Sequence, residues 1–186
     1  LVMFRDDDNI TTIDHFHDKS GHITSYLTDQ VMSDLPDYIQ NFLVQTAILE
    51  RFDAPLANAV CGRTDSFEIL KKLEPLHALL VPLDDAKTTF RYHPLFADCL
   101  QELLRQHLPN SEINSLHTKA SLWFEAEDCV GEAVRHARLA GDFDRCASLI
   151  ELAGGWELIL YGGIGYLRNL LRNIPENEVS NYPRIQ

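Results

Sequence analysis

A short hairpin pattern that runs directly into a helix constrains the fold of this chain more than any other feature. Two apolar runs, 78–83 and 89–92, flank a polar turn, as expected for a pair of antiparallel strands. His93-Pro94 follows at once, and proline is favourable in the first turn of a helix. The sequence therefore predicts a small hairpin that is closed by a helix over 94–107.

Helical spacing of apolar residues surrounds this hairpin on both sides. Two short helices that meet at Gly62 are predicted before it, with Phe67 on the apolar face of the second. After Pro109 the pattern predicts helices alone, the first capped by Ser111 and the last covering 164–173. Short alternating helices with alanine at close-packing positions are typical of helical-repeat arrays.

These patterns predict a mainly α-helical fold that contains one small β-hairpin. A helical segment leads into a winged-helix-like domain, and TPR-like helical repeats follow it. We expect the end of a preceding module, or a linker from it, over 1–22. The helical plus winged-helix domain is expected over 23–108, and the start of the repeat domain over 109–186.

The acidic composition argues against one class of function. The chain has 186 residues and a net charge of −12, whereas binding along a nucleic-acid backbone requires clustered lysine and arginine. Between Glu50 and Tyr92 there are six basic and seven acidic residues. A stand-alone DNA-binding winged helix is therefore the weakest of the alternatives.

Cysteine usage and hydropathy indicate a cytoplasmic protein without a membrane partner. The four cysteines are dispersed, and no CxxC spacing suggests a zinc site or a redox pair. No apolar run approaches the ~20 residues of a membrane span, and the charged stretch 5–8 is unlike a signal peptide. The chain begins at Leu1 without methionine, and we expect it to be a central piece of a larger protein.

Several short sequence segments occur in the order and spacing that are typical of a known family. They lie at 26–31, 42–52, 54–56, 79–85, 90–96, 136–137 and 140–143. In these segments the chain resembles the MalT-like, LuxR-type ATP-dependent transcriptional regulators, which are members of the STAND class of signal-transduction ATPases. The resemblance covers nearly the whole chain.

The resemblance implies a central signal-coupling module, which links nucleotide state to inducer sensing and so to DNA-bound activation by the parent protein. Residues 1–22 would end the nucleotide-binding module or lead from it, and 109–186 would start the sensor domain. The parent would bind ATP or ADP with Mg²⁺, and a small-molecule or protein inducer would bind the repeats.

The implied partners of this chain are the other domains of the same protein. Promoter DNA would be bound only through a C-terminal helix-turn-helix outside this chain. The alternative interpretation is a non-enzymatic helical-repeat scaffold for protein interactions, which would need no nucleotide.

The chain carries no catalytic motif. Walker A requires a Gly-Lys pair, and none of the nine glycines precedes a lysine. The Gly-x-Ser-x-Gly elbow of serine hydrolases is absent as well. We therefore expect no enzymatic activity from this chain, while the resemblance implies that the parent is a STAND ATPase.

His93 is the candidate site residue. In the regulators that this chain resembles, a winged-helix histidine just before the closing helix contacts the β-phosphate of ADP in the resting state. An imidazole can donate a hydrogen bond or carry a charge to phosphate. Two interpretations of His93 stay open: an ADP phosphate contact in the parent protein, or a structural histidine that caps the helix.

Other polar side chains carry weaker signals. His15, His17 and His22 alternate in a polar segment without a fourth ligand, so no metal site is predicted there. Glu132 and His136 lie four positions apart on one predicted helix, and we expect them to pair at the surface.

Aromatic residues of the repeats are interpreted as core. Trp123, Phe124 and Trp156 could line an inducer groove, but aromatic residues at helical spacing more often pack inside. The glycine-rich stretch 154–165 is expected to permit a close helix crossing or a hinge.

Overall fold

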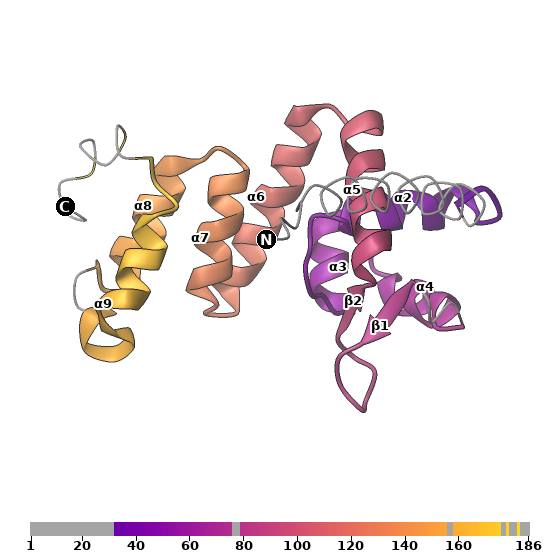
Figure 1. Ribbon diagram of the computed structural model, residues 1–186, viewed down its shortest axis with the longest axis horizontal. Helices are drawn as coiled ribbons and strands as arrows, with labels where there is room; N and C mark the ends of the chain where they lie inside the picture. Colours follow the sequence, from indigo (N-terminus) through magenta and orange to yellow (C-terminus); the bar gives the residue numbers. More distant parts are fainter. Residues whose placement is uncertain (1–31, 76–78, 156–157, 176–177, 179–181, 183–186) are drawn as a thin grey trace, which may run out of the picture.

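A computed structural model describes residues 32–75, 79–155, 158–175, 178 and 182. This part of the chain is mainly helical with one two-stranded antiparallel sheet, which confirms the predicted fold class. Figure 1 shows an elongated molecule, with the hairpin and α2 to α5 at one end and α6 to α9 following toward the other. The elements are α2 Asp37–Thr46, α3 Ala54–Cys61, α4 Ser66–Leu73, β1 Leu80–Pro82, β2 Phe90–Tyr92, α5 Pro94–His107, α6 Asn110–Ala126, α7 Val130–Leu139, α8 Phe143–Leu152 and α9 Leu158–Leu171.

Local sequence signals set both ends of α3. The Asp53 carboxylate accepts a hydrogen bond from the Leu56 amide at 2.9 Å, which satisfies one of the free donors at the helix N-terminus. Gly62 ends the helix in the left-handed conformation with φ 65°, where a residue with a side chain would be strained. The turn into α4 therefore lies where the sequence predicts it.

The hairpin is joined to the preceding loop as well as to itself. β1 and β2 pair antiparallel, with Leu80 opposite Tyr92. Phe90 exchanges two backbone hydrogen bonds with Phe52, at 2.9 and 2.8 Å, so the loop between α2 and α3 adds a bridge to the sheet. At the tip, the Asp84 carboxylate accepts hydrogen bonds from two turn amides, which lower its pKa to about 2. Hydrogen bonds thus stabilise the hairpin at Phe90, beside the preceding loop, and at the turn that follows β1.

Apolar packing forms two clusters of buried residues. The first joins α2 to α5 and the hairpin, and it includes Leu116 and Ala120 of α6. The second joins α7, α8 and α9. The division at 108/109 stays a prediction, and apolar packing is continuous across it because α6 takes part in the first cluster.

The predicted place of Phe67 on the apolar face of α4 is wrong. Its side chain is 64% exposed, whereas Ser66, Ile69, Leu70 and Leu73 are buried. Successive residues of a helix are turned by about 100°. Ser66 takes the direction toward the core, so Phe67 is turned away from it.

One predicted helix start is corrected, and another lies at a kink inside a longer helix. α6 begins at Asn110 after Pro109, with no side-chain cap, so Ser111 lies inside the first turn instead of capping it. α9 begins at Leu158, but Gly163, with φ 74°, breaks it into two parts, and the second part begins after this break, at the predicted start at 164. The glycine makes this left-handed break possible, because a residue without Cβ adopts positive φ at little cost.

Candidate functional site

We call α2 to α5 with the hairpin the winged-helix part and α6 to α9 the helical repeats. They meet along one packed seam, where α3, α5 and the α2–α3 loop face α6 and α7. α6 packs against α3, α5 and α7. Lys119 on α6 donates a hydrogen bond from Nζ to the Val60 carbonyl of α3 at 3.3 Å. α6 therefore belongs to both halves of the molecule.

Arg135 on α7 joins the repeats to the loop between α2 and α3. Its Nη1 donates to the Glu50 carboxylate at 2.8 Å, and its Nε donates to Glu132 at 2.9 Å. Glu50 is largely exposed, and exposed ion pairs add little stability. The interaction thus orients the two sides of the seam more than it holds them together.

The predicted pairing of Glu132 with His136 is wrong, because Arg135 takes the carboxylate and His136 is fully buried. Nδ1 of His136 lies 2.9 Å from Nδ1 of His117 on α6. The Phe124 ring stacks on His136, with ring centroids 5.4 Å apart. Two imidazoles thus meet inside the contact between α6 and α7.

Both imidazoles are neutral near pH 7. Burial, followed by the positive charge of Arg135, lowers the pKa of His117 to about 4 and that of His136 to about 3. A neutral imidazole has one N–H donor and one nitrogen acceptor, so the two Nδ1 atoms share one hydrogen.

A cavity of about 430 Å³ lies at the seam beside His117. Its walls come from both halves of the molecule, and they combine an apolar surface with a few polar groups. The lining residues are Ala47, Ile48, Leu49, Glu50, Tyr92, Ala97, Gln101, Leu104, Arg105, Ile113, His117, Arg135 and Leu139.

A buried hydrogen-bond pair lies behind one wall of this cavity. The hydroxyls of Thr46 and Tyr92 are 2.6 Å apart, and Thr46 Oγ1 also donates to the Phe42 carbonyl at 2.7 Å. Because the threonine hydroxyl has only one hydrogen, Tyr92 is the donor to Thr46. Burial raises the pKa of Tyr92, so the phenol stays protonated and α2 stays joined to β2.

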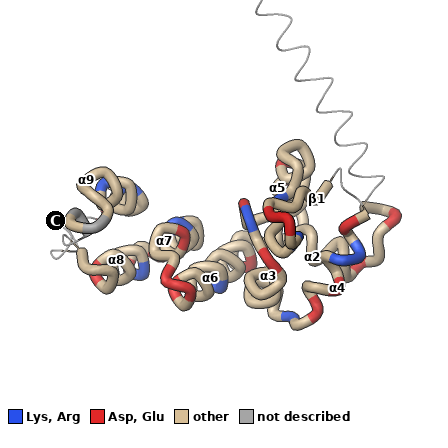
Figure 2. The backbone as a smooth tube through the Cα atoms, turned by 90° about the horizontal axis from the view of Figure 1, so that it is seen from below, with Lys and Arg blue, Asp and Glu red and all other residues tan. Residues whose placement is uncertain are grey.

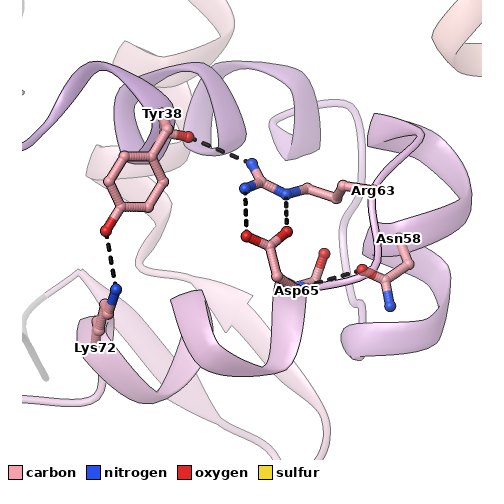
Figure 3. Close-up of polar contacts among 6 residues, drawn as sticks. Tyr38, Asn58, Arg63, Asp65 and Lys72 are labelled. Atoms are coloured by element: carbon pink, nitrogen blue, oxygen red, sulfur yellow. Dashed lines mark hydrogen bonds and ion pairs between the residues drawn. The ribbon is translucent and has the colours of Figure 1, made fainter.

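A polar network joins α2 to the turn between α3 and α4 (Figure 3). Arg63 donates to the Asp65 carboxylate at 2.6 and 2.9 Å and to the Tyr38 carbonyl at 3.4 Å. Lys72 donates to the Tyr38 hydroxyl at 3.0 Å, and the Asn58 side chain accepts a hydrogen bond from the first amide of α4 at 3.1 Å. These contacts orient the helices of the winged-helix part.

His93, the site residue predicted from the sequence, lies exposed at the start of α5. Its amide donates to the Leu79 carbonyl at 2.9 Å, and its carbonyl accepts from the Ala97 amide at 2.9 Å. His93 is the N-cap residue of α5, the position that the structural interpretation gives it, and its side chain makes no capping hydrogen bond. The contact with ADP phosphate stays a prediction.

Trp123 and Phe124 pack edge to face, with ring centroids 5.2 Å apart, and both lie partly buried against the first cluster. This is the packing expected of core aromatics. Trp156 and the three histidines near the start of the chain lie outside the described residues.

Acidic and basic residues are interspersed along the described backbone (Figure 2). On α4, the helix just before the hairpin, Lys71 and Lys72 share the surface with Glu68, and Glu74 follows directly. This mixed charge is unlike the basic face of a DNA-recognition helix. No helix in the described part of the chain is long and apolar enough to cross a bilayer.

Sequence reasoning missed the groups that meet at the seam. Glu50 and Arg135 are 85 positions apart, and no local pattern relates them. His117 follows Leu116 on the buried face of α6, and this helical position was the only available signal that its imidazole is buried.

Known proteins match most of this chain. Residues 28–112 match the family described as the MalT winged helix domain. The chain is 27% identical over 176 residues to the HTH-type transcriptional regulator MalT of Vibrio cholerae, covering 95% of this chain and 19% of that protein. It is also 27% identical over 166 residues to MalT of Klebsiella pneumoniae, covering 89% and 18% of the two chains.

A third relative is a protein kinase. The serine/threonine-protein kinase PknK of Mycobacterium tuberculosis is 33% identical over 132 residues, covering 71% of this chain and 12% of the kinase. The chain spans about a fifth of the length of the MalT regulators that it matches.

The matched range contains α3, the hairpin with its bridge to the α2–α3 loop, and the closing helix α5. The resemblance inferred from the sequence segments is thereby confirmed. Residues 28–112 match the MalT winged helix domain, and most of the chain is similar to MalT-type transcriptional regulators.

Proposed function

We propose that this chain is the signal-coupling module of an ATP-dependent transcriptional regulator in the cytoplasm. In this proposal, the winged helix and the first repeats move together and relate nucleotide state to inducer sensing. ATP or ADP with Mg²⁺ binds another module of the parent protein, and the inducer binds the repeats. Promoter DNA is bound by a separate helix-turn-helix.

The packing of α6 carries this proposal. Coupling between two distant sites requires an element whose position both sites influence. Leu116 and Ala120 of α6 are buried in the first cluster, while α6 also packs along α7. A displacement of α7 by the sensor therefore displaces the winged helix, because a close-packed contact does not deform continuously.

His93 is the residue that we expect to sense the nucleotide. Its backbone is fixed by hydrogen bonds to Leu79 and Ala97, while its side chain is exposed at the surface. An imidazole in this position can donate to a phosphate of a neighbouring module. The N-terminus of α5 adds a favourable field for negative charge.

The test is the rate of ADP release from the full-length regulator that carries His93→Ala. Loss of one charge-assisted hydrogen bond is expected to speed release about tenfold or more and to raise basal transcription. Arg91→Ala, at an exposed position on β2, is the matched control and should release ADP at the normal rate. Normal ADP release from folded His93→Ala protein would remove His93 from the nucleotide site.

A second candidate function is a helical-repeat scaffold for protein interactions. Large apolar side chains are exposed near α8 and α9, with Leu152 at 79%, Leu160 at 73% and Ile164 at 66%. Exposed apolar groups of this size favour contact with further protein. A scaffold predicts no nucleotide binding by the full-length protein, so the ADP measurement separates the two candidates.

A further inference from the structure

The cavity at the seam has the composition of a small-molecule site. Its volume of about 430 Å³ falls within the range typical of ligand pockets, about 300 to 1,000 Å³. Ile48, Leu104, Ile113 and Leu139 contribute apolar surface. We propose that this cavity binds a small monocarboxylate with an apolar body, whose carboxylate is held by His117 and Arg135. This site is independent of the nucleotide contact proposed for His93.

The buried imidazole pair determines which group His117 presents to the cavity. Nε2 of His136 is sealed from solvent and has no hydrogen-bond partner. A buried acceptor without a hydrogen-bond partner is tolerated better than a buried donor without one. His136 therefore carries its hydrogen on Nδ1 and donates it to Nδ1 of His117. The hydrogen of His117 then lies on Nε2.

We infer that Nε2 of His117 faces the cavity. Within the described part of the chain it has no hydrogen-bond partner, and it is not among the sealed polar atoms. His117 lines the cavity, so its N–H is a donor that only a ligand or solvent can satisfy. The pair with His136 fixes the orientation of the ring.

Arg135 supplies the second donor. Its Nη1 and Nε are used by Glu50 and Glu132, whereas Nη2 has no partner in the described part of the chain. Arg105 adds positive charge at the cavity wall, although Glu102 pairs with it. In this proposal, a single carboxylate accepts from Nη2 of Arg135 and from His117, and the ion pair with Glu50 stays in place.

These features select the class of ligand. Two donors and an apolar wall favour a carboxylate with a hydrocarbon body, because charge-assisted hydrogen bonds are stronger than neutral ones. A dianion would be disfavoured by Glu50 and Glu132, which already neutralise much of the charge of Arg135. An amide of the same shape lacks the charge.

The experiment is a titration of the whole chain with sodium acetate, butyrate, octanoate and phenylacetate. Binding is followed by the ¹⁵N resonance of His117 Nε2 and by calorimetry. We expect saturable binding of octanoate or phenylacetate with a shift of the Nε2 signal, and at least about tenfold weaker binding of phenylacetamide.

Three variants locate the site. Arg135→Gln removes a donor, and Ala97→Leu fills the cavity without touching the ion pair; each should weaken binding at least about tenfold. Arg138→Gln changes an exposed arginine of α7 that does not line the cavity, and it should bind normally. Ala97→Leu keeps the test valid if Arg135→Gln does not fold.

The proposal is overturned if no carboxylate moves the Nε2 signal at about 10 mM, if the amide binds equally well, or if Arg138→Gln alone weakens binding.

Discussion

Lowering the pH from 7 to 5 should destabilise this chain through the buried pair of His117 and His136. Both rings are enclosed by α6 and α7, with Phe124 stacked on His136. Arg135 and Arg138 lie near enough to oppose a further positive charge, and the nearest carboxylates of the seam are engaged with Arg135. Protonation of either ring is therefore much less favourable in the folded state.

The magnitude follows from the pKa values. Each imidazole has an ordinary pKa of 6.5, which falls in the folded chain to about 4 for His117 and about 3 for His136. Because the folded pKa is the lower one, the unfolded chain binds more protons below pH 6.5. The stabilisation is fully present above pH 6.5 and declines as the pH falls toward 4 and 3. At pH 5 the loss is about 2 kcal/mol for each histidine, and about 4 kcal/mol for the pair.

Urea unfolding followed by far-UV circular dichroism measures this loss at pH 7, 6 and 5. His136→Leu removes one of the two groups and should reduce the difference between pH 7 and pH 5 by about 2 kcal/mol. His107→Asn, at an exposed position of α5, should leave the difference unchanged. The reasoning is refuted if His136→Leu keeps the full pH dependence, or if His107→Asn reduces it as much.

Three further predictions concern the stability of the winged-helix part, measured by urea unfolding at pH 7. Thr46→Val leaves the buried Tyr92 hydroxyl without its acceptor and should cost about 1–3 kcal/mol, whereas Thr46→Ser should cost much less; equal losses would show that the hydroxyl is not needed. Asp53→Ala removes the cap of α3 and should cost about 1 kcal/mol, and an unchanged free energy of unfolding would contradict the capping role. Leu100→Ala, at a fully buried position of α5, should cost about 2–5 kcal/mol, while Leu95→Ala, 51% exposed on the same helix, should be nearly neutral; similar losses would contradict the assigned core.

Much of the fold could be predicted because short-range signals determine it. Gly62 and Asp53 mark the two ends of α3 through backbone conformation and capping, and both act within a few residues. The hairpin and the closing helix follow from alternation and from Pro94 in the first helical turn. The error at Phe67 arose because spacing gave an apolar face without showing that Ser66 would occupy its centre.

The seam could not be predicted in the same way. Glu50 meets Arg135, and His117 meets His136, only because α6 packs between the winged helix and α7. Pairing of Glu132 with His136 was expected from a spacing of four, and it failed because Arg135 offered a charged partner on the same helix. Side-chain choices of this kind depend on tertiary packing, which one sequence does not display.

The most direct measurement compares two nucleotide states of the full-length regulator by pulsed electron–electron double resonance. Spin labels on non-natural amino acids at Lys71 of α4 and Arg138 of α7, both exposed, report the distance across the seam. If the winged helix and the first repeats move as one body, the distance distribution is the same with ADP as with ATP plus inducer. A shift of more than about 5 Å between the two states would show that the seam itself opens, and it would contradict rigid-body coupling through α6.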